Sequence, residues 1–364
     1  PFFIPEGGAK YFHAPWAFLF AEGIFVLTGL NRGVLLIDLE GTQLTAEESQ
    51  LISLPSVAGI VLFSRNYQSR EQLIALVCSV RNVRRDLLIC VDQEGGRVQR
   101  FKDGFTRLPP AQAYGAFDPD QQCQMAYESG WLMACELLAC GVDLCLGPVL
   151  DIDHGKTSIV GDRAFGRSAG EVIHLASLWV DGVHEAGMSV VIKHFPGHGN
   201  VDSDSHVSLP LDDRTFDEVW QSDMQPFRVM IQKGVEAMMP AHIVFPAVDQ
   251  NPVGYSPEWL KGVLRNQLEF KGLVISDCLT MEGAAKTGSY PARARAALDA
   301  GCDLLIICNR QGVLDVLDEI DGPGLQGAGP GDLMPDSYTD WDSLEKSGRY
   351  QKVIKMLAGA FGAG

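Results

Sequence analysis

The feature that most constrains the fold is a set of short apolar runs that recur along the chain from residue 34 onward. Each run is rich in leucine or β-branched residues, and each ends in polar or glycine residues. The eight runs are 34–41, 57–63, 87–96, 142–153, 189–199, 237–246, 273–282 and 302–309. Stretches with helical spacing separate them, and this alternation predicts parallel strands connected by helices.

The helical stretches and the number of strands indicate which parallel fold to expect. Apolar residues repeat at three- and four-residue spacing in segments such as 69–82 and 121–140. An open doubly wound sheet is the alternative, but such sheets more often have about six strands and carry GxGxxG after the first. The first run continues instead as DLEGTQL. We therefore predict an α/β fold, a single (β/α)8 TIM-type barrel with a C-terminal helical tail.

Three segments follow from this pattern. Residues 1–32 precede the first strand and form an N-terminal extension, which we expect to be dispensable for folding and activity. Residues 33–320 form the barrel. Residues 321–364 begin as a glycine-rich linker and end in a C-terminal helix, for which the amphipathic stretch 341–357 is the candidate.

Composition and charge exclude several classes of partner. The net charge of −17 argues against nucleic acid, because phosphate binding requires a basic face. Residues 14–30 are apolar, but Glu22 interrupts them, so we expect neither a membrane span nor a signal peptide. The nine cysteines form no CxxC pair, which predicts free thiols in a reducing cytoplasm. We expect a monomer that acts on a small molecule.

Polar residues follow the third to the eighth run, where such barrels place their catalytic groups. These residues are Asp92, Glu94, Asp151, Asp153, Lys193, His194, His198, His242, Asp277 and Asn309. Each also has a purely structural interpretation, because barrels bury ion pairs and hydrogen-bonded histidines at the same rim.

The segment 193–210, KHFPGHGNVDSDSHVSLP, has the densest set of such groups. Five of its side chains are acceptable metal ligands: His194, His198, Asp202, Asp204 and His206. A loop that contains several glycines and a proline does not fix ligand directions as HExxH on a helix does. We therefore favour proton transfer and ligand binding for this segment, and we expect no metal and no cofactor.

Five motifs together resemble those of the bacterial cytoplasmic β-N-acetylglucosaminidases of glycoside hydrolase family 3. They are KHFPGHG (193–199), DSH (204–206), VDQEGGRVQRF (91–101), GDRAFGR (161–167) and SDCLTMEGA (276–284). The resemblance extends from Gly33 to Asn309, in the family's order. It implies a single-domain barrel in the cytoplasm that removes terminal N-acetylglucosamine from muropeptides or chito-oligosaccharides during peptidoglycan recycling.

The resemblance also implies roles for individual residues. Asp277 falls on the family's nucleophile, His206 on its acid/base, and Asp204 on the partner of that histidine. The implied substrate-binding residues are Asp92, Arg100, Arg163, Lys193 and His194. One position departs from the family pattern, because Cys278 stands where a second aspartate usually follows the nucleophile.

The chemistry of a retaining glycosidase is compatible with this set of residues. Such enzymes usually need two carboxylates, one as nucleophile and one as acid/base. Imidazole can replace the second, because its pKa lies near neutrality and both protonation states are populated. Two alternatives remain: a phosphorylase, since histidine does not repel an incoming phosphate, and a non-catalytic sugar-binding barrel, if Cys278 reflects lost activity.

Overall fold

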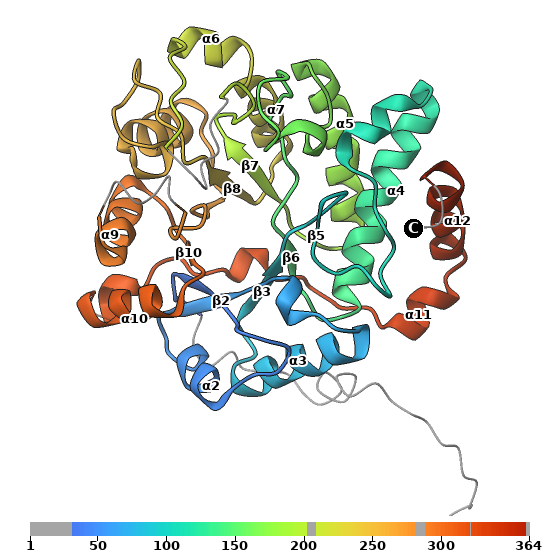
Figure 1. Ribbon diagram of the computed structural model, residues 1–364, viewed down its shortest axis with the longest axis horizontal. Coiled ribbons are helices and arrows are strands. Elements are labelled where there is room, and N and C mark those ends of the chain that lie inside the picture. The colour runs from blue at the N-terminus through green and yellow to red at the C-terminus, as the bar shows by residue number, and fades with distance from the viewer. Residues whose placement is uncertain (1–30, 202–208, 282–287, 321, 362–364) are drawn as a thin grey trace, which may run out of the picture.

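The computed structural model describes residues 31–201, 209–281, 288–320 and 322–361. Each predicted run contains one strand of a parallel wall, which lies at the centre of the molecule with helices around it (Figure 1). The strands are β1 (Leu35–Asp38), β2 (Val57–Leu62), β3 (Leu88–Val91), β6 (Leu144–Cys145), β7 (Val191–Phe195), β8 (Ala237–Pro240), β9 (Leu273–Val274) and β10 (Leu305–Ile307).

The strands follow one another in sequence order around the wall. The strands form two sheets, here called ladders, with the orders β10-β1-β2-β3-β6 and β7-β8-β9, and all neighbouring strands in them are parallel. Single parallel bridges, Cys145 with Val190 and Ile275 with Leu304, join the two ladders on both sides. The prediction of a (β/α)8 barrel is confirmed, and the open doubly wound alternative is wrong.

Helices connect the strands and cover the outside of the wall. They are α2 (Ala46–Ile52), α3 (Arg70–Val83), α4 (Pro119–Leu138), α5 (Ala169–Glu185), α6 (Phe216–Gln221), α7 (Met224–Lys233), the π-helix η5 (Glu258–Gln267), α9 (Tyr290–Ala300) and α10 (Arg310–Glu319). The predicted helices 69–82 and 121–140 correspond to α3 and α4. Ser69 caps α3, whose apolar residues at helical spacing are buried against the barrel. No helix in the described ranges has both the length and the apolar character of a membrane span.

An antiparallel hairpin interrupts the parallel pattern directly after β3. It consists of β4 (Gln93–Gly95) and β5 (Val98–Gln99). The buried carboxamide of Gln93 accepts the backbone N–H of Arg100 at 2.9 Å, which fixes the start of the segment that carries the Arg100 side chain. Gly95 is required in the turn, because its φ is 103° and a Cβ there would lie 2.4 Å from the Pro109 carbonyl oxygen. The sequence predicts a single strand run at 87–96 and no hairpin, so the hairpin differs from the prediction.

The C-terminal tail forms two helices, α11 (Trp341–Lys346) and α12 (Gly348–Phe361), where the sequence predicted one amphipathic helix at 341–357. Both lie on the outside of the molecule next to α4 (Figure 1). The Tyr350 hydroxyl donates to the carboxylate of Glu136 on α4 at 2.9 Å. Burial raises the pKa of Glu136 to about 7. The tail is thus anchored to the barrel by a buried polar contact as well as by apolar packing.

Two residues of the predicted extension contact the barrel. The Asn31 side-chain amide donates to the backbone oxygens of Ala58 and Asp86 at 2.9 and 2.8 Å. The carbonyl of Arg32 accepts the backbone N–H of Gly327 at 2.8 Å. A chain that begins at Gly33 therefore lacks the Asn31 side chain, which bonds to β2 and to the segment before β3.

We expect a chain that begins at Asn31 to be as stable and as active as the full chain. A chain that begins at Gly33 should lose about 1–3 kcal/mol of unfolding free energy, because two partly buried carbonyls lose their donor. Urea denaturation of both shortened chains measures the difference, and Asn31→Ala in the full chain is the matched control. Equal stability of the two shortened chains would show that the Asn31 contacts contribute nothing.

Candidate active site

A cavity of about 530 Å³ lies at the carboxyl ends of the strands, which is a size typical of small-molecule sites. Its wall includes six of the residues predicted from the sequence: Asp92, Arg100, Arg163, Lys193, His194 and Asp277. The other two predicted residues, Asp204 and His206, lie outside the described residues. The fold thus brings together the six described residues for which the resemblance implied a role. Two of the strand-end candidates lie elsewhere, since Asp153 pairs with Arg167 and Asn309 caps α10.

Lys193, in the middle of β7, bridges two carboxylates. Its Nζ lies 2.9 Å from Asp92 Oδ1 and 2.8 Å from Glu94 Oε1, and its side chain is only 4% exposed. Burial alone would lower the pKa of Lys193, but the two carboxylates raise it above its ordinary value. Burial alone would raise the pKa of both acids, but Lys193 and the neighbouring arginines lower that of Asp92 and bring that of Glu94 to about 2. All three groups are therefore charged at neutral pH.

Two arginines extend this ion-pair chain at its ends. Arg163 donates to both oxygens of Glu94 at 2.8 Å, in the paired geometry that suits guanidinium and carboxylate. Arg100 donates to Asp92 Oδ2 at 2.9 Å. Among the described residues, no group accepts a hydrogen bond from the buried Nε of Arg100.

His194 is held in one orientation by the buried Asp151. Oδ2 of Asp151 lies 2.7 Å from Nδ1 of His194, and Oδ1 accepts the backbone N–H groups of His194 and His198 at 3.2 and 2.8 Å. Burial alone would raise the pKa of Asp151, but the two histidines and these hydrogen bonds lower it. An ionised carboxylate only accepts, so Nδ1 carries the proton and Nε2 is left for a ligand.

Asp277 follows β9 and lies in the cavity wall. Its Oδ1 accepts the backbone N–H of Cys278 at 2.7 Å. Burial alone would raise the pKa of this carboxyl, but His242, His194 and the Cys278 N–H lower it. The buried His242 in turn hydrogen-bonds to the Cys278 carbonyl at 3.2 Å. The site thus holds an ionised carboxylate a few residues after the end of β9, and such a group can act as a nucleophile.

Several residues of the site had no role assigned from the sequence. Glu94, Asp151 and His242 belong to the strand-end set, so their position was visible but their partners were not. Arg65 and Arg97 also line the cavity, each paired with an aspartate, Arg65 at 2.5 Å and Arg97 at 2.9 Å. Arg65 comes from a connecting segment that no motif covers, whereas Arg97 lies within the motif 91–101 but had no role assigned to it.

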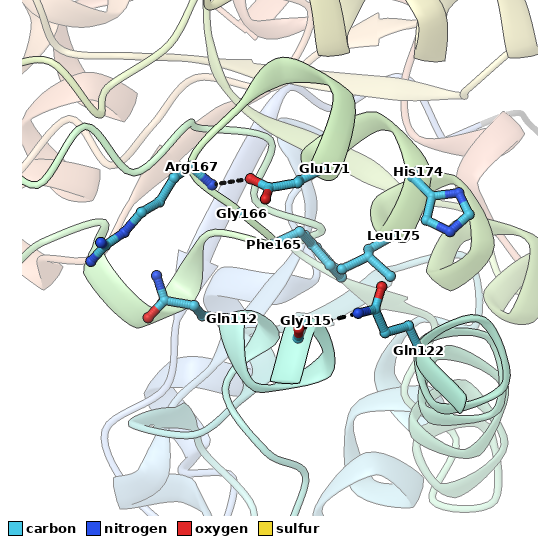
Figure 2. A pocket seen from close by; sticks show the side chains of 9 residues that line it. All are labelled: Gln112, Gly115, Gln122, Phe165, Gly166, Arg167, Glu171, His174 and Leu175. Atoms are coloured by element: carbon cyan, nitrogen blue, oxygen red, sulfur yellow. Dashed lines mark hydrogen bonds between the residues drawn. The ribbon is translucent and has the colours of Figure 1, made fainter. Parts of the chain in front are cut away.

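A second cavity, of about 310 Å³, lies beside the N-terminal end of α5 (Figure 2). Its wall consists of Gln112, Gly115, Gln122, Phe165, Gly166, Arg167, Glu171, His174 and Leu175. Figure 2 shows that some of its polar groups are already paired with one another: the Arg167 backbone N–H donates to Glu171, and the Gln122 amide donates to the Gly115 carbonyl. It contains no residue predicted for the site, so the larger cavity is the candidate active site.

The five possible metal ligands of segment 193–210 lie partly within and partly outside the described residues. Within the described ranges, no group of three or more histidine, cysteine, aspartate or glutamate side chains is placed to hold a metal ion. Three of the five possible ligands, Asp202, Asp204 and His206, lie outside those ranges. The two that are described, His194 and His198, both contact Asp151 through their backbone N–H groups.

Known proteins resemble the chain over most of its length. The β-hexosaminidase of Tolumonas auensis is 46% identical over 324 residues, which cover 88% of this chain and 96% of that protein. The β-hexosaminidase of Methylococcus capsulatus is 44% identical over 329 residues, which cover 88% of this chain and 98% of that protein. The crystal structure of NagZ from Neisseria gonorrhoeae in complex with N-trifluoroacetyl-D-glucosamine superposes with a TM-score of 0.83 at 39% identity, over 91% of this chain and 98% of that one.

The match to a protein family covers the barrel. Residues 32–323 match the family described as Glycosyl hydrolase family 3 N terminal domain. This range includes all eight strands and every described residue of the candidate active site. The chain therefore belongs to glycoside hydrolase family 3.

Proposed function

We propose that this protein is a retaining exo-β-N-acetylglucosaminidase that acts through a covalent intermediate on Asp277. The observation that carries the proposal is the ionised Asp277 carboxylate in the wall of a sugar-sized cavity. The relatives named β-hexosaminidase and the gonococcal structure with N-trifluoroacetyl-D-glucosamine support the choice of sugar.

The ion-pair chain supplies the groups that a sugar needs. Asp92 bonds to Lys193 and Arg100 through one oxygen each, so both oxygens keep capacity to accept from sugar hydroxyls. Arg100 and Arg163 supply donors for hydroxyl and acetamido oxygens, and Nε2 of His194 can accept from a hydroxyl. Because these groups are already fixed by one another, little side-chain entropy is lost when the sugar binds.

We propose that His206 is the acid/base and that Asp204 orients it, although both lie outside the described residues. The resemblance of the 204–206 motif to that of the family implies these roles. Asp92 and Glu94 have lowered pKa values and are already ion-paired, so at neutral pH neither holds a proton to donate. A histidine has a suitable pKa range to supply the proton for the leaving oxygen.

His206→Ala should slow substrates with poor leaving groups by on the order of 10²-fold or more, and activated aryl glycosides far less, because only the former need a proton in the first step. Asp204→Ala should show a milder form of the same contrast. Pre-steady-state rates on a disaccharide and on a nitrophenyl glycoside measure it. Equal losses on both substrates in the glycosylation step would remove His206 from the acid role.

A phosphorylase on the same scaffold is the second candidate. The observation that favours it is the number of cationic side chains in the cavity wall: Arg65, Arg97, Arg100, Arg163 and Lys193. Product analysis with and without inorganic phosphate separates the two reactions. Hydrolysis gives N-acetylglucosamine in both conditions, first as the β-anomer by NMR, whereas phosphorolysis gives the sugar 1-phosphate. No turnover at all would favour a non-catalytic sugar-binding barrel.

We further propose that the substrate is a muropeptide or chito-oligosaccharide handled in the cytoplasm by a monomer, as part of peptidoglycan recycling. All nine cysteines are free thiols in the structure, which supports a reducing compartment. Comparison of kcat/KM for a muropeptide and for chitobiose tests the aglycone preference.

A further inference from the structure

Two cysteines, Cys278 and Cys308, lie next to each other in the wall of the active-site cavity. They follow β9 and β10, which are neighbouring strands joined by the bridge of Ile275 with Leu304. The N–H of the residue after Cys278 donates to the Ile306 carbonyl at 2.9 Å, which keeps the two strand ends together. Both thiols are free and half-buried.

The two thiols are chemically unequal. The neighbouring Cys308 thiol lowers the pKa of Cys278 against the opposing effect of burial, and the Thr280 hydroxyl adds to the lowering. Thr280 Oγ1 lies 3.0 Å from Cys278 Sγ. The neighbouring Cys278 thiol in turn raises the pKa of Cys308. Of the pair, Cys278 loses its proton more readily, and a thiolate is the form of cysteine that reacts.

The other cysteines do not share this environment. Burial raises the pKa of those in the protein interior, which makes them inert: Cys90, Cys135, Cys140, Cys145 and Cys302. Cys123, on α4, is half-buried but does not line the cavity, so it serves as a comparison thiol.

We propose that Cys278 and Cys308 form a reversible oxidation site that switches the enzyme off when a peroxide enters the cavity. The Cys278 thiolate attacks hydrogen peroxide, an S–O bond forms, the O–O bond breaks, and hydroxide leaves and takes up a proton as water. The Cys308 sulfur then attacks the sulfenic sulfur, an S–S bond forms, and the S–O bond breaks. Hydroxide leaves again and takes the Cys308 proton as a second water. Two thiols and one peroxide thus give one disulfide and two waters.

The position of Cys278 explains why this change inactivates. A disulfide joins its sulfur atoms at about 2.05 Å, which is much closer than two thiols in hydrogen-bonding contact. Closing the bond therefore draws Cys278 toward β10. The backbone N–H of Cys278 holds the Asp277 carboxylate at 2.7 Å, and its carbonyl accepts from His242. Movement of this residue displaces the proposed nucleophile.

The test is treatment of the full chain with hydrogen peroxide in the presence of a chelator, followed by a chromogenic N-acetylglucosaminide assay. The wild type should lose at least about tenfold in activity and recover it with dithiothreitol, since a dithiol reverses disulfide formation. Peptide mass mapping of the inactive form should show a disulfide between Cys278 and Cys308. Cys123→Ser should keep wild-type basal activity and wild-type sensitivity.

Two further variants separate the steps. Cys278→Ser should keep most of its own untreated activity after peroxide, and Cys308→Ser should accumulate a sulfenic acid on Cys278 that dimedone traps. If either variant fails to fold, peptide mass mapping of the oxidised wild type tests the proposal, which requires a disulfide between Cys278 and Cys308. Unchanged wild-type activity, or inactivation that maps to Met281 or to any cysteine outside the pair, overturns the proposal.

Discussion

Asp277→Ala is expected to lower kcat/KM for an N-acetylglucosaminide by on the order of 10⁴–10⁶-fold, the range seen when members of a nucleophilic catalytic unit are removed. The carboxylate lies at the end of β9, is ionised, and is held by the Cys278 N–H. Its removal leaves the anomeric carbon without an attacking group. Steady-state kinetics measure the loss, and thermal unfolding should stay close to that of the wild type.

Chemical rescue and trapping make the assignment specific. Azide can enter the space left by the Asp277 carboxylate and attack the same face of the sugar, so Asp277→Ala with azide should form the α-glycosyl azide. A 2-fluoro or 5-fluoro sugar should label Asp277 in the wild type. Asp181→Ala, which removes an exposed surface aspartate, is the matched control and should keep full activity. Label on any other residue would contradict the assignment.

Lys193→Met is expected to lower the unfolding free energy by about 3–5 kcal/mol, because it leaves two buried carboxylates without the cation they share. It should also lower kcat/KM, by an amount that corresponds to about 2–5 kcal/mol of lost transition-state stabilisation, because Asp92 loses the contact that orients it. Denaturant titration and steady-state kinetics measure the two effects. Lys233→Met is the matched control, and its exposed pair with Asp181 should contribute about 1 kcal/mol or less.

The difference in unfolding free energy between the wild type and Lys193→Met should become smaller as the pH falls. Lys193 and the arginines lower the folded-state pKa of Asp92 and Glu94. The stability from these pairs is therefore fully present above the unfolded-state pKa of about 4, and it is lost as the pH falls through the lowered folded-state values. The gap between wild type and Lys193→Met should be widest near neutrality and should narrow below about pH 4. A gap that widens in acid would mean that the buried charges are not the cause.

Most of the fold could be predicted because strands and helices leave local signals. The eight runs contain the eight parallel strands, since β-branched residues that are buried on both faces make short continuous apolar runs. The hairpin β4–β5 was not predicted, because its stability comes from the buried Gln93 carboxamide and from a glycine turn rather than from periodicity. The break between α11 and α12 was missed for a similar reason, since apolar spacing continues across it.

The residues of the site were easier to predict than their interactions. Position after a strand identified Asp92, Lys193 and Asp277 as candidates, because the barrel gathers its strand ends. The pairing of Lys193 with Asp92 joins residues 101 positions apart, and no local pattern encodes such a contact. The role of Glu94 depends on Arg163, which comes from a connecting segment. The roles of Asp204 and His206 remain predictions from the sequence.

The barrel wall consists of two sheets, and we expect a bound sugar to stabilise the enzyme by joining them. Asp92 follows a strand of the five-stranded ladder, whereas Lys193 and Asp277 extend from the three-stranded one. A sugar held by all three, as proposed above, would span the junction and act as a temporary cross-link. A ligand that binds only the folded state stabilises it by about 2.7 kcal/mol at a hundred times its Kd. Cellular proteases, which cut opened chains, would then spare the enzyme while substrate is abundant and clear it once the sugar is exhausted.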